Sequence, residues 1–104
     1  MKKVVMYSGS PCPYCDHAKA LLKSKNVPFE EIDVWKNKDK AKEMLKRTNG
    51  ARTIPQIFIG EHYVGGNDQL QAANKSGELD KLLAFSTEEI ISFHKFKTIF
   101  LVLL

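Results

Sequence analysis

The chain has 104 residues, a formal net charge of +4, and 43% hydrophobic and 27% charged residues. These values are typical of one soluble globular domain with a single hydrophobic core. Two cysteines do not form the disulfide framework of a small secreted protein, and the apolar run after Met1 is too short for a signal peptide. We therefore expect a cytoplasmic protein in a reducing compartment.

The positive charge is spread along the chain, and its densest run lies between Trp35 and Arg47. Asp39 and Glu43 interrupt this run, which favours a solvated helix face; a patch for acidic partners is the alternative. No basic stripe with interleaved aromatic residues is present. We therefore expect no nucleic-acid partner.

The first half of the chain alternates strand and helix patterns. Residues 3–8 form a continuous apolar run, typical of a strand buried on both faces. After a loop with Gly9 and Pro11, a helical pattern extends from Pro13 to about Ser24. Residues 29–35 are predicted to form a second strand. The second predicted helix has an inward face and a stop signal at Asn49-Gly50; that face comprises Ala41, Met44, Leu45 and Thr48.

The second half begins with two short strand patterns, residues 55–60 and 62–66, which Gly60 and Glu61 join as a hairpin. Asn67-Asp68 is predicted to cap a third helix. Gly77 ends that helix, and a fourth is expected over residues 78–84.

This order, β-α-β-α-β-β-α, predicts an α/β fold with a four-stranded mixed sheet flanked by helices on both faces. The first β-α-β unit places two strands parallel, and the hairpin adds antiparallel strands. Cys12 and Cys15 then lie at the carboxyl end of the first strand. Active sites of open α/β sheets gather at that edge.

The two cysteines, in the stretch "GSPCPYC", have three conceivable roles. As metal ligands they supply two of the four that zinc needs, and His17, His62 and His94 have no ligand-like spacing. As a structural disulfide they close a loop too small to restrict the unfolded chain much. As a redox pair they fit well, because a strand precedes them and a helix follows.

Cys12 is predicted to lie at the N-terminus of the first helix. Unpaired N–H groups and the positive end of the helix dipole stabilise a thiolate at such a position. Pro13 fits the first turn because it needs no hydrogen bond there. Cys15, one turn further, is expected to be more buried. This asymmetry favours a nucleophile at Cys12 and a resolving thiol at Cys15.

Three separated motifs now carry a family resemblance: "CPYC" at residues 12–15, "TIPQIFI" at 53–59 and "GGND" at 65–68. In kind, order and spacing they resemble the dithiol glutaredoxins, over about residues 3–84. The resemblance implies a thioredoxin-like fold over a domain of residues 1–85. It also implies glutathione as reductant and co-substrate, with no metal.

The resemblance further implies a glutathione site. Pro55 is expected to follow a cis peptide bond, so that Ile54 offers its backbone to the cysteinyl part of glutathione. The helix start at Gly66 is expected to bind the γ-glutamyl carboxylate, while Asp68 accepts from its ammonium group. The implied set of binding residues is Tyr14, Lys42, Thr53, Ile54, Pro55, Gly66, Asn67 and Asp68.

The sequence departs from the family pattern at two positions. The family often has Lys where this chain has Gly9, and a second Asp where it has Gln69. Such a Lys helps to bind the glycyl carboxylate and to stabilise the thiolate. Either Lys42 takes over this work, or glutathione binds more weakly.

The function expected from the resemblance is glutathione-dependent reduction of protein disulfides and of protein–glutathione mixed disulfides through Cys12 and Cys15. Two alternatives stay open. One is a thioredoxin-type reductase served by a flavoenzyme, which "GGND" disfavours. The other is a dimer that holds an iron–sulfur cluster through Cys12 and glutathione, which Pro13 and Cys15 disfavour.

Residues 86–104 lie beyond the resemblance and form a C-terminal extension. "STEE" at residues 86–89 is a capping-box signature, and a helical stripe of apolar residues follows. The last six residues are apolar, far fewer than the about 20 that span a bilayer. We expect a helix packed on its own domain or on a second copy, with a membrane-surface anchor as the alternative. The domain itself is expected to be a monomer.

Overall fold

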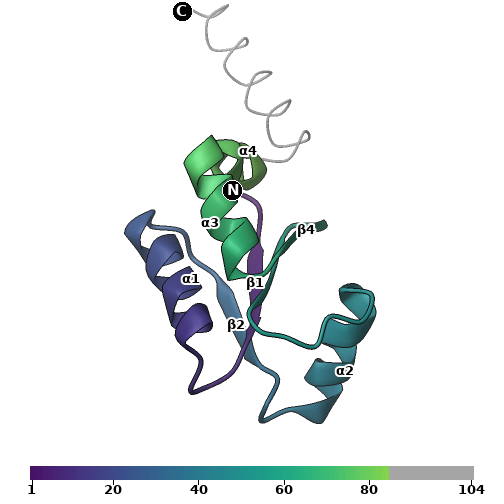
Figure 1. Ribbon diagram of the computed structural model, residues 1–104. Coiled ribbons are helices and arrows are strands. Elements are labelled where there is room, and N and C mark those ends of the chain that lie inside the picture. The colour runs from purple at the N-terminus through teal and green to yellow at the C-terminus, as the bar shows by residue number, and fades with distance from the viewer. Residues whose placement is uncertain (85–104) are drawn as a thin grey trace, which may run out of the picture.

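The computed structural model describes residues 1–84 (Figure 1). The predicted C-terminal extension at residues 86–104 lies outside this part of the chain. Within residues 1–84, no helix combines the length and the apolar character that a membrane span requires.

The first β-α-β unit consists of β1 (Val4–Ser8), α1 (Pro13–Ser24) and β2 (Glu30–Asp33), and its two strands pair in parallel as predicted. β2 is shorter than the predicted strand of residues 29–35. The Asp33 carboxylate accepts hydrogen bonds from the N–H groups of Trp35 (2.9 Å) and Lys36 (3.0 Å). This local turn leads the chain out of the sheet.

The second helix, α2 (Lys38–Arg47), is capped by Asn37, whose side chain accepts from the N–H groups of Asp39 and Lys40. The predicted inward face is confirmed, with Met44 and Thr48 buried. Asn49 (φ 58°) and Gly50 (φ 102°) follow in the left-handed region. The helix ends there because these residue types tolerate that conformation.

The predicted hairpin is also present, as β3 (Gln56–Ile59) and β4 (His62–Gly65). Gly60 has φ 58°, a value that a two-residue hairpin turn commonly needs and that glycine adopts without strain. β3 pairs antiparallel with β1, and β4 pairs antiparallel with β3. The sheet order is β2-β1-β3-β4, which confirms the mixed four-stranded sheet.

The last two helices are α3 (Asn67–Ser76) and α4 (Glu78–Leu83), separated by Gly77. The prediction that Asn67-Asp68 caps α3 is wrong, because Gly66 is the capping residue. The Gly66 N–H donates to Gln69 Oε1 at 2.9 Å, so the cap comes from a side chain inside the helix. Asn67 is already helical, and its side-chain oxygen accepts from Gln71 Nε2 at 3.1 Å.

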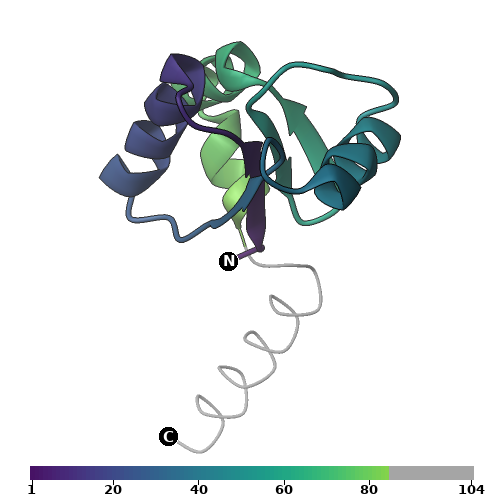
Figure 2. The ribbon, with the colours of Figure 1, turned by 90° about the horizontal axis from the view of Figure 1, so that it is seen from below.

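The two faces of the sheet carry different cores, because side chains alternate along β1 and β3. Figure 2 shows α1 and α2 on opposite sides of the sheet. The core on the α1, α3 and α4 side comprises Val4, Met6, Ala18, Leu22, Val27, Ile57, Ile59, Leu70, Leu79 and Leu83. The core on the α2 side comprises Tyr7, Val34, Met44 and Phe58. Burial on both faces fixes β1, and with it the loop that leads to Cys12.

Candidate functional site

Cys12 and Cys15 form a disulfide at the start of α1, with their Cα atoms 5.2 Å apart. Cys12 is 8% exposed and Cys15 is fully buried. The predicted asymmetry between the two cysteines is therefore confirmed. Of the two sulfurs, only that of Cys12 belongs to a residue that reaches the surface, so an external thiol or disulfide meets it first.

Cys12 is the N-cap residue of α1, and its sulfur accepts a hydrogen bond from the backbone of the first turn. The Cys15 N–H donates to Cys12 Sγ at 3.1 Å, and the Asp16 N–H donates to the Cys12 carbonyl at 3.0 Å. Helix N-termini stabilise anions through such N–H groups and through the helix dipole. After reduction, the same N–H group is available to a thiolate at Cys12.

The segment before β3 faces the disulfide. The Ile54–Pro55 peptide bond is cis, as the resemblance implied. The Ile54 carbonyl oxygen lies 4.0 Å from Cys12 Sγ. Folding therefore places this segment beside a cysteine that lies some forty residues earlier in the chain.

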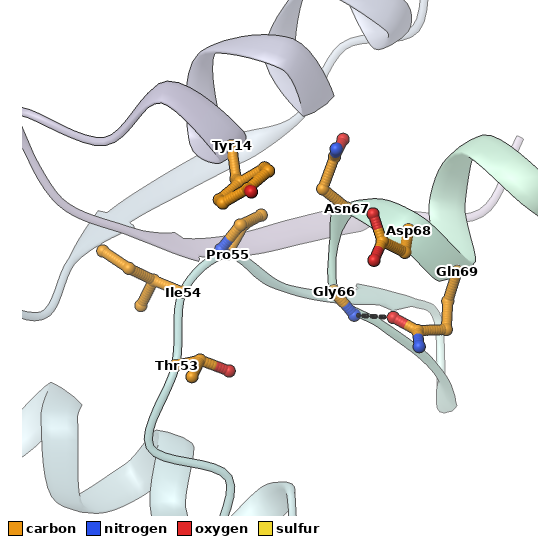
Figure 3. Close-up of a pocket in the computed structure, with 8 residues that line it drawn as sticks. All are labelled: Tyr14, Thr53, Ile54, Pro55, Gly66, Asn67, Asp68 and Gln69. Atoms are coloured by element: carbon orange, nitrogen blue, oxygen red, sulfur yellow. Dashed lines mark hydrogen bonds between the residues drawn. The ribbon is translucent and has the colours of Figure 1, made fainter.

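Next to this segment lies a pocket of about 280 Å³, referred to below as the α3 pocket. Figure 3 shows the side chains of Tyr14 and Pro55 close together, across from the first turn of α3. The pocket is lined by Tyr14, Thr53, Ile54, Pro55, Gly66, Asn67, Asp68 and Gln69. Seven of the eight residues implied by the resemblance thus lie together. The eighth, Lys42, is exposed on α2 and does not line this pocket.

Two glutamines that the sequence analysis did not assign to the site support the pocket. Gln69 lines the pocket, and its Oε1 accepts a hydrogen bond from the N–H of the N-cap residue Gly66. Gln56 is 3% exposed, and its Nε2 donates to the Thr53 carbonyl (2.9 Å) and to Thr53 Oγ1 (3.2 Å). The Tyr63 hydroxyl donates to Gln56 Oε1. The spacing of Gln69, three residues after the cap, is a recognisable signal, whereas the contact between Gln56 and Thr53 has none.

An ion pair joins α1 to β2 beside Ser8, the last residue of β1 before the loop to Cys12. Lys19 Nζ lies 2.8 Å from Glu31 Oε2, and the Ser8 hydroxyl donates to the same oxygen at 3.0 Å. The hydrogen bond from Lys19 is the main reason that the pKa of Glu31 lies below its ordinary value. The same bond raises the pKa of Lys19. The pair therefore favours both charged forms.

A second polar cluster attaches α2 to the other face of the sheet. The Tyr7 hydroxyl donates to Glu43 Oε2 at 2.8 Å and accepts from Arg47 Nη1 at 2.9 Å. Burial raises the pKa of Tyr7, while the hydrogen bond from Tyr7 lowers the pKa of Glu43. The Arg47 guanidinium also lies 3.9 Å from the centre of the Phe58 ring. These contacts hold α2 against β1, through Tyr7, and against β3, through Phe58.

Metal-ligating side chains do not gather in the described part of the chain. Among residues 1–84, no group of three or more His, Cys, Asp or Glu side chains is placed to hold a metal ion.

Comparisons with known proteins agree with this geometry. The sequence model of the glutaredoxin family matches residues 4–64, more than half of the chain. Glutaredoxin 3 of Escherichia coli K12 is 48% identical over 83 residues, which cover 80% of this chain and 99% of that protein. Among solved structures, glutaredoxin from Brucella melitensis has a TM-score of 0.70 at 46% identity, covering 80% of this chain and 89% of its own.

A buckwheat glutaredoxin solved as a complex with glutathione has a TM-score of 0.71 at 27% identity, covering 79% of this chain and 76% of its own. The fold is thus the thioredoxin-like fold implied by the motifs, and the cysteine pair stands where a dithiol member carries it. The chain belongs to the glutaredoxin family and is a thiol–disulfide oxidoreductase.

Proposed function

We propose that this protein reduces protein disulfides and protein–glutathione mixed disulfides with glutathione as its reductant. The observation that carries the proposal is the α3 pocket beside Cys12, with a helix start at one end and the Ile54 backbone at the other. The reaction requires a compartment with a glutathione pool, and we propose the cytoplasm.

The chemistry of the α3 pocket suits the three parts of glutathione. The first turn of α3 offers backbone N–H groups to the γ-glutamyl carboxylate, and Asp68 offers a carboxylate to the neighbouring ammonium group. The backbone of Thr53 and Ile54 is available to pair with the cysteinyl residue in an extended conformation. Tyr14 is 64% exposed and offers its ring to the same ligand. The glutathione complex of the buckwheat relative supports this assignment.

With a protein–glutathione mixed disulfide, the Cys12 thiolate attacks the glutathionyl sulfur, which the α3 pocket holds nearest to it. A Cys12–glutathione disulfide forms, the original S–S bond breaks, and the protein cysteine leaves as a thiolate. A second glutathione thiolate then attacks the glutathionyl sulfur. Glutathione disulfide leaves, and the Cys12 thiolate is restored.

With a protein disulfide, the Cys12 thiolate attacks one of the two sulfurs and forms a mixed disulfide with it, while the protein S–S bond breaks and the other protein cysteine leaves as a thiolate. The Cys15 thiolate attacks Cys12 Sγ, which releases the reduced protein and gives the Cys12–Cys15 disulfide seen here. One glutathione reopens this disulfide at Cys12, and a second removes the first as glutathione disulfide. The burial of Cys15 suits an internal attack, since its sulfur needs no access from outside.

The experiment compares two sources of electrons for the full chain. A glutathionylated peptide and a peptide disulfide are offered with NADPH, glutathione and glutathione reductase, or with NADPH and thioredoxin reductase. We expect turnover of both substrates in the glutathione system and little in the other. Turnover with thioredoxin reductase but not with glutathione would contradict the proposal. Cys12→Ser protein supplies the uncatalysed rate.

A further inference from the structure

Gly9, the position where the family often has lysine, is covered by the side chain of Trp35. A Cβ atom placed on Gly9 would lie 2.5 Å from Trp35 Cδ2, 2.7 Å from Trp35 Cε3 and 2.9 Å from Ile54 Cδ1. Real contacts of a Cβ atom are longer, so even a methyl group requires Trp35 to move. Glycine is needed here for space, and no side chain stands between Trp35 and the loop to Cys12.

The backbone of Trp35 is fixed on both sides. The Val34 N–H donates to the Ser8 carbonyl at 2.9 Å, which extends the pairing of β1 and β2 by one residue. The Asp33 carboxylate then holds the turn through the Trp35 N–H. The indole lies against Gly9, which Ile54 Cδ1 also approaches, yet Trp35 remains 56% exposed. We refer to Gly9, Trp35 and the Ile54 side chain as the Trp35 shelf.

The Trp35 shelf and the α3 pocket lie on two sides of Ile54. The Ile54 carbonyl approaches Cys12 Sγ, and the residue lines the pocket. In Figure 3 its side chain points away from Gly66 and Asn67, and its Cδ1 atom is the one that lies beside Gly9. Trp35 does not line the α3 pocket. The shelf is therefore a second surface near the reactive sulfur.

We propose that Trp35 is a specificity-determining residue whose exposed indole face receives an apolar or aromatic side chain next to the reacting cysteine of a protein substrate. This inference rests on the proposed function, because it concerns the polypeptide half of the disulfide that Cys12 attacks. If the α3 pocket holds the glutathionyl half, the polypeptide half lies on another side of Cys12. The shelf offers an apolar surface there.

The chemistry of the shelf selects a polypeptide rather than glutathione. Glutathione has no apolar side chain beside its cysteine, only a γ-glutamyl group and a glycine. The Cα atoms of residues adjacent to a cysteine lie within about 4 Å of its own, so where the substrate chain turns at the cysteine a flanking side chain can reach the shelf when the sulfurs meet. Tryptophan supplies large contact area at low entropic cost, and it is enriched among residues that dominate binding.

The test omits glutathione, so it can fail or succeed independently of the proposed reductant. Full-length Cys15→Ser protein is reacted with disulfide dimers of two short peptides that differ only in whether Phe or Ser flanks the cysteine on both sides. The Cys12 thiolate attacks one peptide sulfur, a Cys12–peptide disulfide forms, and the second peptide leaves as a thiolate. Mass spectrometry follows the rate.

We expect the Phe peptide to react about two- to tenfold faster than the Ser peptide. Trp35→Ala should bring this ratio close to one by slowing the Phe peptide, and Trp35→Phe should keep most of the ratio. Lys36→Ala, in the same turn, is the matched control and should keep all of it. A ratio near one in the parent protein, or a ratio that survives Trp35→Ala, would overturn the proposal.

A second measurement uses Trp35 as its own reporter, since the chain contains one tryptophan. Formation of the mixed disulfide with the Phe peptide should shift the tryptophan emission to shorter wavelength, and the Ser peptide should not. Gly9→Ala displaces the indole without removing it, so it should alter the emission of the free protein and abolish the peptide preference. An unchanged emission with both peptides would contradict contact at the shelf.

Discussion

The α3 pocket and the Trp35 shelf, which meet at Ile54, are built in different ways. Apart from Gln69, the α3 pocket consists of motif residues, several of which act through their backbone, such as Gly66 and Ile54. The Trp35 shelf consists of two side chains from separate segments, those of Trp35 and Ile54, beside Gly9, which has no side chain. The pocket thus suits one ligand with defined polar groups, whereas the shelf suits many apolar partners. Under the two proposals made above, one cysteine serves a constant co-substrate at the pocket and variable proteins at the shelf.

The largest effect on activity is expected from substitution of Cys12, because the ligands of both the pocket and the shelf react with its sulfur. Cys12→Ser should lower turnover of every substrate to the uncatalysed background, because the variant has no thiolate nucleophile. Cys15→Ser should keep much of the activity on glutathionylated peptides but lose the reduction of peptide disulfides that require an internal resolving thiol. The glutathione-coupled assay measures both. Equal loss in the two variants on glutathionylated peptide would contradict the assigned roles.

Gln56 supports the segment of Thr53 and Ile54, which contributes to both the α3 pocket and the Trp35 shelf. Gln56→Leu leaves the Thr53 carbonyl and the Tyr63 hydroxyl without their partner. We expect the free energy of unfolding to fall by about 0.5–1.5 kcal/mol, the net worth of a hydrogen bond, because Thr53 and Tyr63 are exposed and water can replace the lost partner. Urea denaturation measures this loss, and Tyr63→Phe should show a smaller one. A fully stable Gln56→Leu variant would show that the segment before β3 is held by other contacts.

A substitution of Asp68 tests the α3 pocket independently of the Trp35 shelf, because Asp68 belongs to the pocket alone. Asp68→Asn should raise the KM for glutathione about tenfold, the loss expected for one hydrogen bond between charged groups. The ratio of rates with the Phe and Ser peptides should stay unchanged. Glu78→Gln, the same change of an exposed acid on α4, is the matched control. A changed peptide ratio would mean that pocket and shelf are one surface.

The ion pair between Lys19 and Glu31 predicts a pH dependence of the free energy of unfolding. Since the pKa of Glu31 is lowered from its ordinary 4.5, its pairing stabilises the fold above that pH and is lost as the pH falls through the folded-state pKa. The raised pKa of Lys19 keeps its partner charged throughout this range. Lys19→Met should therefore cost less than about 1 kcal/mol at pH 7, and in urea denaturation this difference should shrink as the pH falls below 4.5 and Glu31 becomes protonated. A constant difference would mean that Lys19 acts through packing.

Lys42 is expected to have the smallest effect. It lies exposed on α2 and outside the α3 pocket, so any contact with a glutathione carboxylate is solvent-screened. Lys42→Ala should raise the KM for glutathione less than about fivefold. Lys46→Ala, another exposed lysine on α2, provides the control. A much larger rise for Lys42→Ala would show that it takes over the role of the lysine that Gly9 replaces.

The prediction from sequence worked best where a feature depends on neighbours in the chain. The helix start at Cys12, the hairpin turn at Gly60 and the helix stop at Asn49-Gly50 are local, and each lies where it was expected. The cap of α3 was misassigned to Asn67-Asp68, although Gln69 lies within the same turn. The end of β2 was placed two residues too late, because the turn that Asp33 makes was not recognised.

The sequence by itself determined the chemistry of this protein, because a cysteine pair at a helix start and three ordered motifs already specify a thiol–disulfide exchange site. Only the tertiary structure decided what surrounds it. The Ile54 carbonyl approaches Cys12, and Trp35 covers Gly9, through contacts that depend on how sheet, loop and turn pack together. Such contacts join residues far apart in the chain and follow no period or spacing. For that reason Gly9, a simple loop residue in the sequence, becomes in the fold the space that Trp35 fills.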